Sequence, residues 1–460
     1  MPETRSFPAC LCEVPHVDRS DGPDGTLSRR NFTPWVLARG GAFGGLSLAE
    51  LLRLKAQAEP GARRDKSIIM LFLSGGPSHL DMYDMKPDAP REYRGPLNPI
   101  RTNVPGVEIC ELMPKQAEIA DKFTILRGCR LSHLHSGNEF YSGYPWQESP
   151  RASIEGEAKR PALGSVLSRL RPGSSGMPPY VSLNNVPDWE RAYYLGLEFE
   201  PFSLDPSSGK EQLENMGRHR DMTSDRLASR GDLLHAIDLL RRDLDNKGMA
   251  KGLDAFQTRA LEIVSSPKVR DAFDVEKESE SMRERYGGKR FREGNNPGKM
   301  LLQARRLVEA GVSVVTACSR GWDTHANNFP AMRDLLPPLD QALHALVTDL
   351  DERGMLQDVM IVMGGEFGRS PRIGDLTPDG RNHWPEAGFL WVAGGGLKTG
   401  QVIGATDARG EKVIGTPIVS QNLFATLYPQ LGIDPSLTFR DHNGRPQYIL
   451  ENRQPIPGLV

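Results

Sequence analysis

The sequence lacks a long apolar segment, and it lacks a strong excess of either charge. Its 460 residues include 57 lysines and arginines against 59 aspartates and glutamates, which gives a formal net charge of −2. A membrane-spanning helix needs about 18 consecutive apolar residues, and nucleic-acid binding relies on a basic surface that neutralises phosphates. We therefore expect neither a membrane-spanning protein nor a nucleic-acid partner.

Cysteine is also scarce, because only 5 occur in the whole chain. Apart from "CLC" near the start, no two cysteines stand at the short spacing of a zinc-binding or redox pair. Neither a structural zinc site built from cysteines nor a dense disulfide framework is expected. At most one disulfide is expected among Cys110, Cys129 and Cys318, and the sequence does not choose the pair.

The first part of the chain carries a pattern of its own. The segment "SRRNF", at residues 28–32, precedes a glycine-rich, weakly apolar stretch and then "AQA" at residues 56–58. This order resembles a twin-arginine export signal followed by a cleavage site. Residues 1–58 are thus predicted to be a leader for the twin-arginine export machinery, with cleavage near Ala58 and a periplasmic or extracellular product. The alternative interpretation is a basic arm that leads into an amphipathic helix.

The remaining residues, 59–460, show the pattern of an α/β domain. The apolar run "IIMLFL" ends in "SGGP", which is typical of a strand that is buried on both faces and stops at a loop. From residue 299 onward, helical and strand patterns alternate, with "VSVVTAC" and "DVMIVMGGEFG" as strands and a helix from Leu339 between them. Strict alternation predicts a mostly parallel sheet covered on both faces. Charged helical patterns at about 205–295 indicate a helical insertion.

Histidines and carboxylates are concentrated in the loops that follow the predicted strands. These loops are "SGGPSHLD", "CRLSHLHSGNEFYSGYPW", "GWDTHANN" and "GGEFGRSPRI" with the following "GRNHWP". In a parallel sheet the carboxyl ends of the strands meet at one edge, where ligands bind. A single such residue could equally cap a helix or pack in a loop. Taken together, the set predicts a site for a divalent metal, because imidazole and carboxylate are the ligands that zinc and similar ions prefer.

The motif order resembles the alkaline-phosphatase-like superfamily, which includes the sulfatases. The resemblance begins with "RRLVEAGVSVVTACSRGWDTHANN" and covers about residues 66–445. The motifs "FLSGGPSHLDMYDMKPDAP", "GWDTHANNF" and "GEFGRSP…GRNHWP" are similar to those of an exported bacterial family of unassigned function, number fifteen hundred and one in the domain-of-unknown-function series. This resemblance implies a three-layer α/β/α sandwich with a mostly parallel central sheet.

The resemblance also implies one or two divalent ions, either zinc or another transition metal, or calcium. One ion would be held by Asp323, His325 and His383. The second would be held by Glu366, with further ligands from a set that the sequence leaves open: His79, Asp81, His133 and His135.

The sequence departs from the superfamily at two metal positions and at the nucleophile. Ser74 stands where a metal-binding aspartate is expected, and Phe367 stands where a metal-binding histidine is expected. The alignment puts His133 at the nucleophile position, with the hydroxyls of Ser132 and Ser136 nearby, and no formylglycine signature is present. A metal-activated water would then replace a protein nucleophile.

Three arginines are candidates for binding the anionic part of a substrate. A guanidinium group can pair with sulfuryl or phosphoryl oxygens as a planar fork. The candidates are Arg369, Arg372 and Arg381. The same side chains could instead lie on the surface or pair with buried acids.

The sequence thus predicts an exported, metal-dependent hydrolase of sulfate or phosphate esters, with an anionic small molecule or polysaccharide as substrate. The alternative is a protein that keeps the fold and the metal but binds its ligand without turnover, which Ser74 and Phe367 favour. A phosphomutase is a third interpretation, and the predicted export argues against it because phosphomutase substrates are cytoplasmic metabolites.

Overall fold

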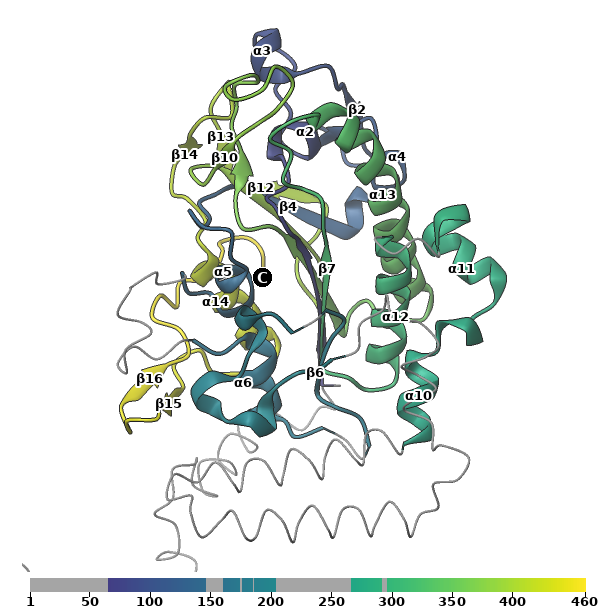
Figure 1. Cartoon of the computed structure of the whole chain (residues 1–460), viewed down its shortest axis with the longest axis vertical. Coiled ribbons are helices and arrows are strands. Elements are labelled where there is room, and N and C mark those ends of the chain that lie inside the picture. Colours follow the sequence, from purple (N-terminus) through teal and green to yellow (C-terminus); the bar gives the residue numbers. More distant parts are fainter. Residues whose placement is uncertain (1–64, 146–159, 174–175, 185, 204–265, 292–295) are drawn as a thin grey trace, which may run out of the picture. The chain divides into compact units, whose positions relative to one another are not determined.

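The computed structural model describes residues 65–145, 160–173, 176–184, 186–203, 266–291 and 296–460 (Figure 1). All of them belong to one compact unit, Ala58–Val460. The predicted leader and residues 204–265 of the predicted helical insertion lie outside the described residues. The described part of that insertion, residues 266–291, is built from short helices.

A central sheet of eight strands has the order β12-β4-β11-β8-β1-β7-β5-β6. Strand β11 is antiparallel to β4 and β8, and every other neighbouring pair in this sheet is parallel. The expected α/β architecture with a mostly parallel sheet is therefore confirmed. Its strands are β1 (Ser67–Leu73), β4 (Phe123–Cys129), β5 (Tyr180–Ser182), β6 (Phe202–Ser203), β7 (Val314–Ser319), β8 (Val359–Gly364), β11 (Gly388–Gly394) and β12 (Gln401–Ile403).

Short strands form antiparallel pairs outside this sheet. They are β2 (Pro99–Arg101) with β3 (Glu108–Cys110), β9 (Gly368–Arg369) with β10 (His383–Trp384), β13 (Ala405–Thr406) with β14 (Val413–Ile414), and β15 (Thr438–Arg440) with β16 (Pro446–Tyr448).

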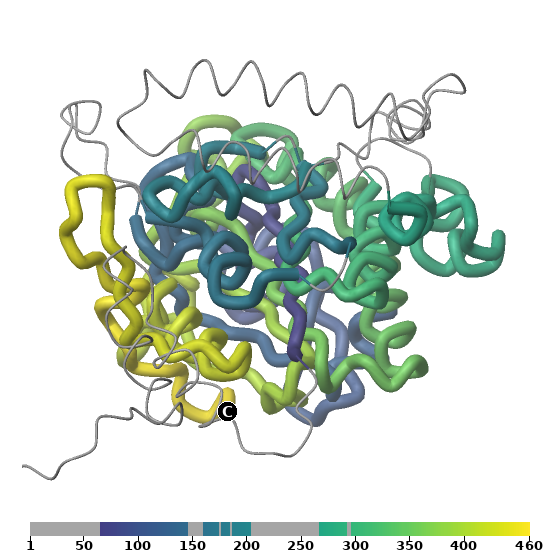
Figure 2. Tube along the Cα trace, turned by 90° about the horizontal axis from the view of Figure 1, so that it is seen from below, coloured from purple at the N-terminus to yellow at the C-terminus, as the bar shows by residue number. Residues whose placement is uncertain are grey.

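Helices cover both faces of the central sheet, which gives the expected three layers. In Figure 1 the sheet runs between α12 and α13 on the right and α5, α6 and α14 on the left. The view from below separates the green helices α12 and α13 from the yellow C-terminal part (Figure 2). The α-helices are α2 (His79–Met82), α3 (Arg91–Arg94), α4 (Pro114–Ala117), α5 (Asn138–Ser142), α6 (Leu163–Leu170), α10 (Pro267–Phe273), α11 (Glu280–Gly287), α12 (Pro297–Glu309), α13 (Asn328–Glu352) and α14 (Ser420–Gln430).

Single-turn 3-10 helices complete the described chain. They are η1 (Ala120–Lys122), η2 (Asp188–Glu190), η3 (Tyr193–Leu195), η4 (Leu197–Phe199), η6 (Val275–Lys277) and η7 (Gly288–Arg290).

Helices α12 and α13 show how far local sequence sets the ends of a helix. Asn296 is the N-cap residue of helix α12, and its side chain accepts a hydrogen bond from the Gly298 N–H. Helix α13 was expected to begin at Leu339 but begins at Asn328, and it continues through Pro337 and Pro338. A proline normally ends or bends a helix, so packing overrides local preference here.

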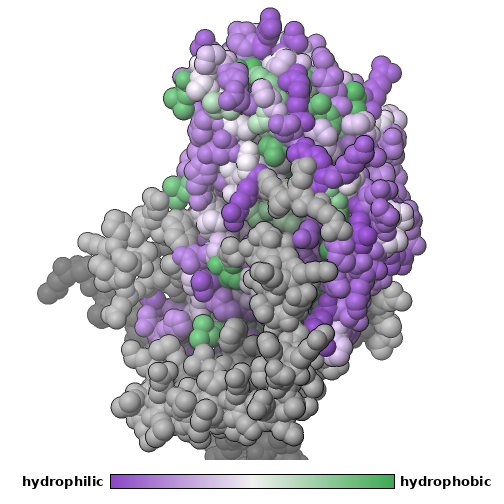
Figure 3. Space-filling view, turned by 45° about the vertical axis from the view of Figure 1, so that its right-hand side comes forward, coloured by the Kyte–Doolittle hydropathy of each residue, from purple (hydrophilic) through white to green (hydrophobic). Residues whose placement is uncertain are grey.

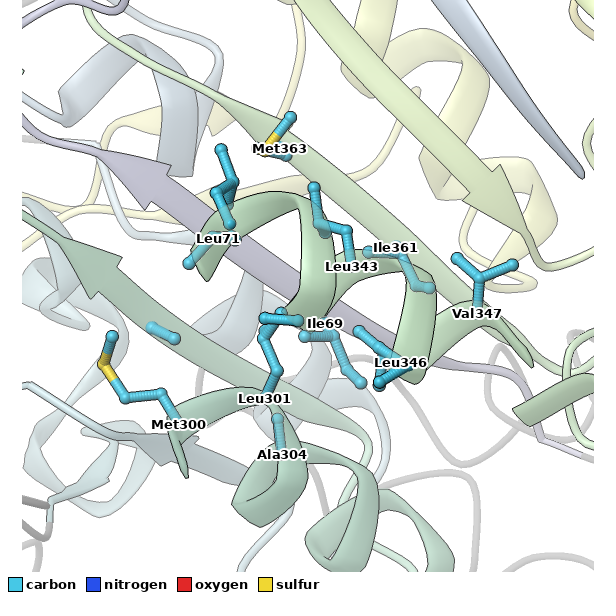
Figure 4. Packing of buried hydrophobic residues seen from close by; sticks show 14 of the residues in the cluster. Ile69, Leu71, Met300, Leu301, Ala304, Leu343, Leu346, Val347, Ile361 and Met363 are labelled. Carbon is cyan, nitrogen blue, oxygen red and sulfur yellow. The ribbon is translucent and has the colours of Figure 1, made fainter. Parts of the chain in front are cut away.

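The core between β1 and the helices of one face is fully apolar. Figure 4 shows Leu71 of β1 and Met363 of β8 close to Leu343 of α13, while Leu301 of α12 lies beside Ile69. Strands that are buried on both faces need such continuous apolar sequences. This explains why "IIMLFL" has no polar alternation.

The direction of the strands decides where the strand-end loops meet. Because β1, β4, β7 and β8 run the same way, the loops after all four lie at one edge of the sheet, near the labels α2 and β10 at the upper end of Figure 1. The reversed strand β11 brings the loop that precedes it to the same edge. This is the edge where the sequence predicted the site.

Polar side chains cover most of the described surface that Figure 3 shows. On the face shown in Figure 3, hydrophobic side chains appear singly among polar ones. Within the described ranges, no helix has the length and apolarity needed to cross a bilayer. The sulfurs of Cys110, Cys129 and Cys318 are free, so the disulfide that the sequence left open does not form among them.

Replacing Leu71 by alanine tests the core. The Leu71 side chain is completely buried, so the change should lower the free energy of unfolding by about 2–5 kcal/mol through lost burial and a residual cavity. Leu376, which is 70% exposed, is the matched control. Leu376→Ala should change the free energy of unfolding by less than about 0.5 kcal/mol. Urea denaturation followed by circular dichroism measures both, and equal effects would contradict this description of the core.

Candidate metal centre

Four side chains from three loops converge at this edge of the sheet. They are His135 after β4, Asp323 and His325 after β7, and His383 before β11, and their ligating atoms all lie within 4.8 Å of one another. The Asp323 Oδ1 atom lies 3.1 Å from His325 Nε2 and 3.0 Å from His383 Nε2. The two imidazole Nε2 atoms of His325 and His383 are 2.9 Å apart. His135 Nε2 lies 3.6 Å from Asp323 Oδ2.

Hydrogen bonds on the outer side of two imidazoles hold their rings in place. His325 Nδ1 lies 3.2 Å from Asn382 Oδ1, and His135 Nδ1 lies 3.1 Å from Glu366 Oε1. If each Nδ1 donates its proton to that oxygen, each Nε2 keeps a lone pair directed at the centre. This is the arrangement found around metal-binding histidines.

The donor set of this centre fits a transition metal. Three imidazole nitrogens and one carboxylate are ligands that suit zinc, whereas calcium and magnesium prefer oxygen ligands alone. The set is also open to solvent on one side, because the Asp323 side chain is 43% exposed. A bound ion would therefore be accessible to a second molecule.

Phe367 forms an aromatic wall beside this centre. Its ring stacks on His383 with the centroids 4.0 Å apart, and the ring of His135 meets it edge-on at 4.9 Å. The resemblance led us to expect a metal-binding histidine at position 367, and the chain has an apolar ring there that limits how the two imidazoles turn.

The "SGGP" motif lets two loops approach closely. Gly75 and Gly76 have φ angles of 114° and 78°, which favour glycine. A Cβ atom on Gly75 would lie 2.4 Å from the Asp323 main-chain nitrogen. The Gly75 and Gly76 N–H groups donate to Glu366 Oε1 and Oε2 at 2.8 and 3.2 Å. These two amides thus bind a carboxylate of the protein itself.

Burial and neighbouring groups lower the pKa of Asp323 and His383 and raise the pKa of Glu366. Burial opposes ionisation of Asp323, but hydrogen bonds from Arg369 and His383 outweigh it, so its pKa lies below the usual value. Burial lowers the pKa of His383 in spite of its bond to Asp323. Burial raises the pKa of Glu366, although the Gly75 N–H and His135 oppose this.

Arg369 is used entirely within the protein. Its side chain is 0% exposed. It donates to main-chain carbonyls at Gly75, Gly76, Trp322 and Arg381, and it forms an ion pair with the Asp323 carboxylate. Of the two uses that the sequence left open for Arg369, the structure shows the pairing with an acid of the protein, and binding of a substrate stays a prediction.

Asp81 and His79 lie apart from the four converging side chains. The Asp81 carboxylate forms a fully buried, two-bond ion pair with Arg381, at 2.8 and 3.0 Å. It also accepts from Asn328 Nδ2 at 2.9 Å. His79 is buried, with Nε2 3.2 Å from the Gly410 carbonyl oxygen. Neither side chain is placed as a ligand, and Arg381 is as fully occupied as Arg369.

The residues predicted near the nucleophile position have local partners. The Ser132 hydroxyl accepts from the Leu134 N–H at 3.1 Å, and the Ser136 hydroxyl accepts from the Asn138 N–H at 3.2 Å. His133 is exposed and does not join the four converging side chains. The catalytic roles assigned to these three residues stay predictions.

The structure adds two features that the sequence did not assign. His135 joins Asp323, His325 and His383 rather than a second group around Glu366. Asn382 was not singled out at all, although its place directly before His383 in "GRNHWP" was a signal that could have indicated it.

The His383 imidazole should titrate at a lower pH than an ordinary histidine, whose pKa is about 6.5. Burial disfavours the imidazolium, and the Arg369 charge adds to this. A histidine whose pKa is depressed in the folded state destabilises that state as pH falls, because the unfolded chain binds the proton more readily. NMR titration of the metal-free protein, with the urea-unfolded chain as control, measures the difference, and an equal or higher pKa in the folded state would contradict it.

Comparisons with known proteins give one family match and several distant structural likenesses. No curated protein matches the sequence. Three solved structures show a distant likeness: a PsFucS1 sulfatase from Pseudoalteromonas sp., the lipoteichoic acid synthase LtaP from Listeria monocytogenes, and Ps i-CgsB in complex with k-i-k-neocarrahexaose. Their identities are 13%, 10% and 10%, and their TM-scores are 0.36, 0.34 and 0.32.

The matches cover 85%, 81% and 81% of this chain and 71%, 74% and 73% of those chains. At this identity and TM-score, the likeness carries no conclusion about the function of this chain. A family model described as "Protein of unknown function (DUF1501)" matches residues 65–460. The chain therefore belongs to the DUF1501 family, which confirms the resemblance seen in its strand-end loops.

Proposed function

We propose that this protein is a metal-dependent hydrolase of sulfate or phosphate esters. One observation carries the proposal: His135, Asp323, His325 and His383 come from three separate loops, and their ligating atoms meet within 4.8 Å. Imidazole and carboxylate are the ligands that zinc and similar ions prefer, and the 43% exposure of the Asp323 side chain leaves one side of the group open to a substrate.

Each residue of the centre has a distinct part in this proposal. His135, Asp323, His325 and His383 would hold the ion, which when bound supplies Lewis-acid polarisation of an ester oxygen. Glu366 and Asn382 would fix the Nδ1 protons of His135 and His325, which orients both rings. Arg369 keeps Asp323 ionised, and its pairing lowers the pKa of that carboxyl group.

The substrate class follows from the order of motifs along the chain. That order resembles the alkaline-phosphatase-like superfamily, and it supports an anionic sulfate or phosphate ester, either a small molecule or a polysaccharide. Export by the twin-arginine machinery, with cleavage near Ala58, belongs to the same proposal and rests on residues 28–32 and 56–58. Zinc or another transition metal fits the three imidazoles better than calcium does.

A second candidate is a metal-containing protein that binds an anionic ligand without turnover. The observation that favours it is that the expected catalytic groups already form hydrogen bonds or ion pairs within the protein. The hydroxyls of Ser132 and Ser136 accept local main-chain N–H groups, and the guanidinium groups of Arg369 and Arg381 are fully buried. A protein with this arrangement could keep its metal and lose the reaction.

Replacing Asp323 by asparagine tests the proposal. The change removes the only anionic ligand of the four but leaves an oxygen that can accept from Arg369. Because the buried Arg369 charge loses its ionised partner, the variant should be less stable, and circular dichroism checks that it is still folded. Metal bound to protein purified without chelator should fall from about one equivalent to less than a tenth of that. Hydrolysis of aryl sulfate and aryl phosphate should fall by at least about 100-fold.

The matched control is Asp375→Asn, because Asp375 is an exposed aspartate on the nearby loop. It should leave metal content and turnover unchanged. Metal in the unchanged protein with no turnover of either ester would favour the binding candidate, and absence of metal would refute both candidates.

A further inference from the structure

We propose that the centre holds a single ion, and that Glu366 and Asp81 serve as positioning groups whose charges are balanced inside the protein. This inference rests on the proposed metal function and deepens it. The sequence left open a second ion held by Glu366 with help from His79, Asp81, His133 or His135. In the structure, each of these side chains either binds other groups of the protein or lies outside a second group of ligands.

Glu366 is held by groups of the protein on both carboxylate oxygens. Its side chain is 2% exposed. Oε1 accepts from the Gly75 N–H and lies 3.1 Å from His135 Nδ1, and Oε2 accepts from the Gly76 N–H. Three of the roughly four acceptor sites of this buried carboxylate are thus taken by groups of the protein, which makes it a poor source of ligand atoms for an ion.

Asp81 is satisfied in the same way. Arg381 binds both of its oxygens, Asn328 and Ser78 bind Oδ2 as well, and the Asp81 and Arg381 side chains are both 0% exposed. Removing one partner of a buried ion pair leaves an uncompensated charge. The pair also holds the chain before His383 in place, because Arg381 Nη1 donates to the Ser370 carbonyl.

The histidines do not complete a second site either. His135 belongs to the first group, and His133 is exposed and outside it. His79 is buried, and its Nδ1 has no hydrogen-bond partner among the described residues. Across the described ranges, however, His79 belongs to no group of three or more His, Cys, Asp or Glu side chains.

Arg369 adds a charge argument against a second ion. Its guanidinium is completely buried between the loops of Gly75 and Asp323, and both Asp323 and Glu366 act on it electrostatically. A buried cation therefore already lies near Glu366, the carboxylate that was predicted to hold a second metal ion. Like charges in such a site repel each other, and this repulsion is only weakly screened by solvent.

Zinc titration of the metal-free protein tests this inference. Calorimetry and native mass spectrometry should show one zinc per chain. In Glu366→Gln the count should stay at one while the affinity falls about 10- to 100-fold, because the His135 ring loses its ionised hydrogen-bond partner. Glutamine keeps an acceptor oxygen for one of the two main-chain amides, and circular dichroism checks that the variant is folded before its zinc affinity is compared. The control Glu386→Gln, on a side chain that is 45% exposed, should change neither count nor affinity.

Two zinc ions per chain, or a count that drops in Glu366→Gln, would overturn the inference even if the protein hydrolyses esters. One zinc per chain without turnover would uphold the inference and defeat the proposed hydrolase. No bound zinc in the unchanged protein would overturn both. A Glu366→Gln variant that binds one zinc with unchanged affinity would refute the positioning role of Glu366.

Discussion

The buried guanidinium of Arg369 is the contact on which the rest of the site depends. It links the Gly75–Gly76 turn, the Trp322–Asp323 segment and the chain at Arg381, which are far apart in the sequence. A buried charge is tolerated only when it is paired and fully hydrogen-bonded. The loops must therefore approach closely enough to satisfy it, and the same approach carries Asp323 to the place where three imidazoles meet.

Around this contact, the site is built from charges that cancel in pairs. Arg369 pairs with Asp323, and Arg381 pairs with Asp81. Glu366 is neutralised differently, by two main-chain amides and an imidazole. The result is a polar layer at the edge of an apolar sheet, held by many hydrogen bonds. Within it, the group of His135, Asp323, His325 and His383 is open to solvent on one side. Hydrogen bonding of this kind is what a metal site needs, because its ligands must keep their geometry.

Local sequence patterns predicted the layers of the fold and the edge of the sheet where the site lies. They failed at the start of a helix that tertiary packing determines. The run "IIMLFL" could only be a buried strand, and its loop does end at the site. Helix α13 shows the opposite case, since it was expected to begin at Leu339 but begins at Asn328 and continues through Pro337 and Pro338. Burial of Met332 and Leu336 holds the first turns in helical form, and local propensity contains no information about that burial.

By itself, the sequence determined which residues stand at the ends of strands, because hydrophobic runs and glycine-rich turns are local properties. Asp323, His325 and His383 could thus be placed in strand-end loops in advance, and the family resemblance grouped them as ligands of one ion. Only the tertiary structure decided which partner each polar atom has. In the structure His135 joins that group, Glu366 accepts from two main-chain amides, and the Arg369 side chain is buried. The reason is physical: a donor binds the acceptor nearest in space, and for loops hundreds of residues apart that distance is set by the fold.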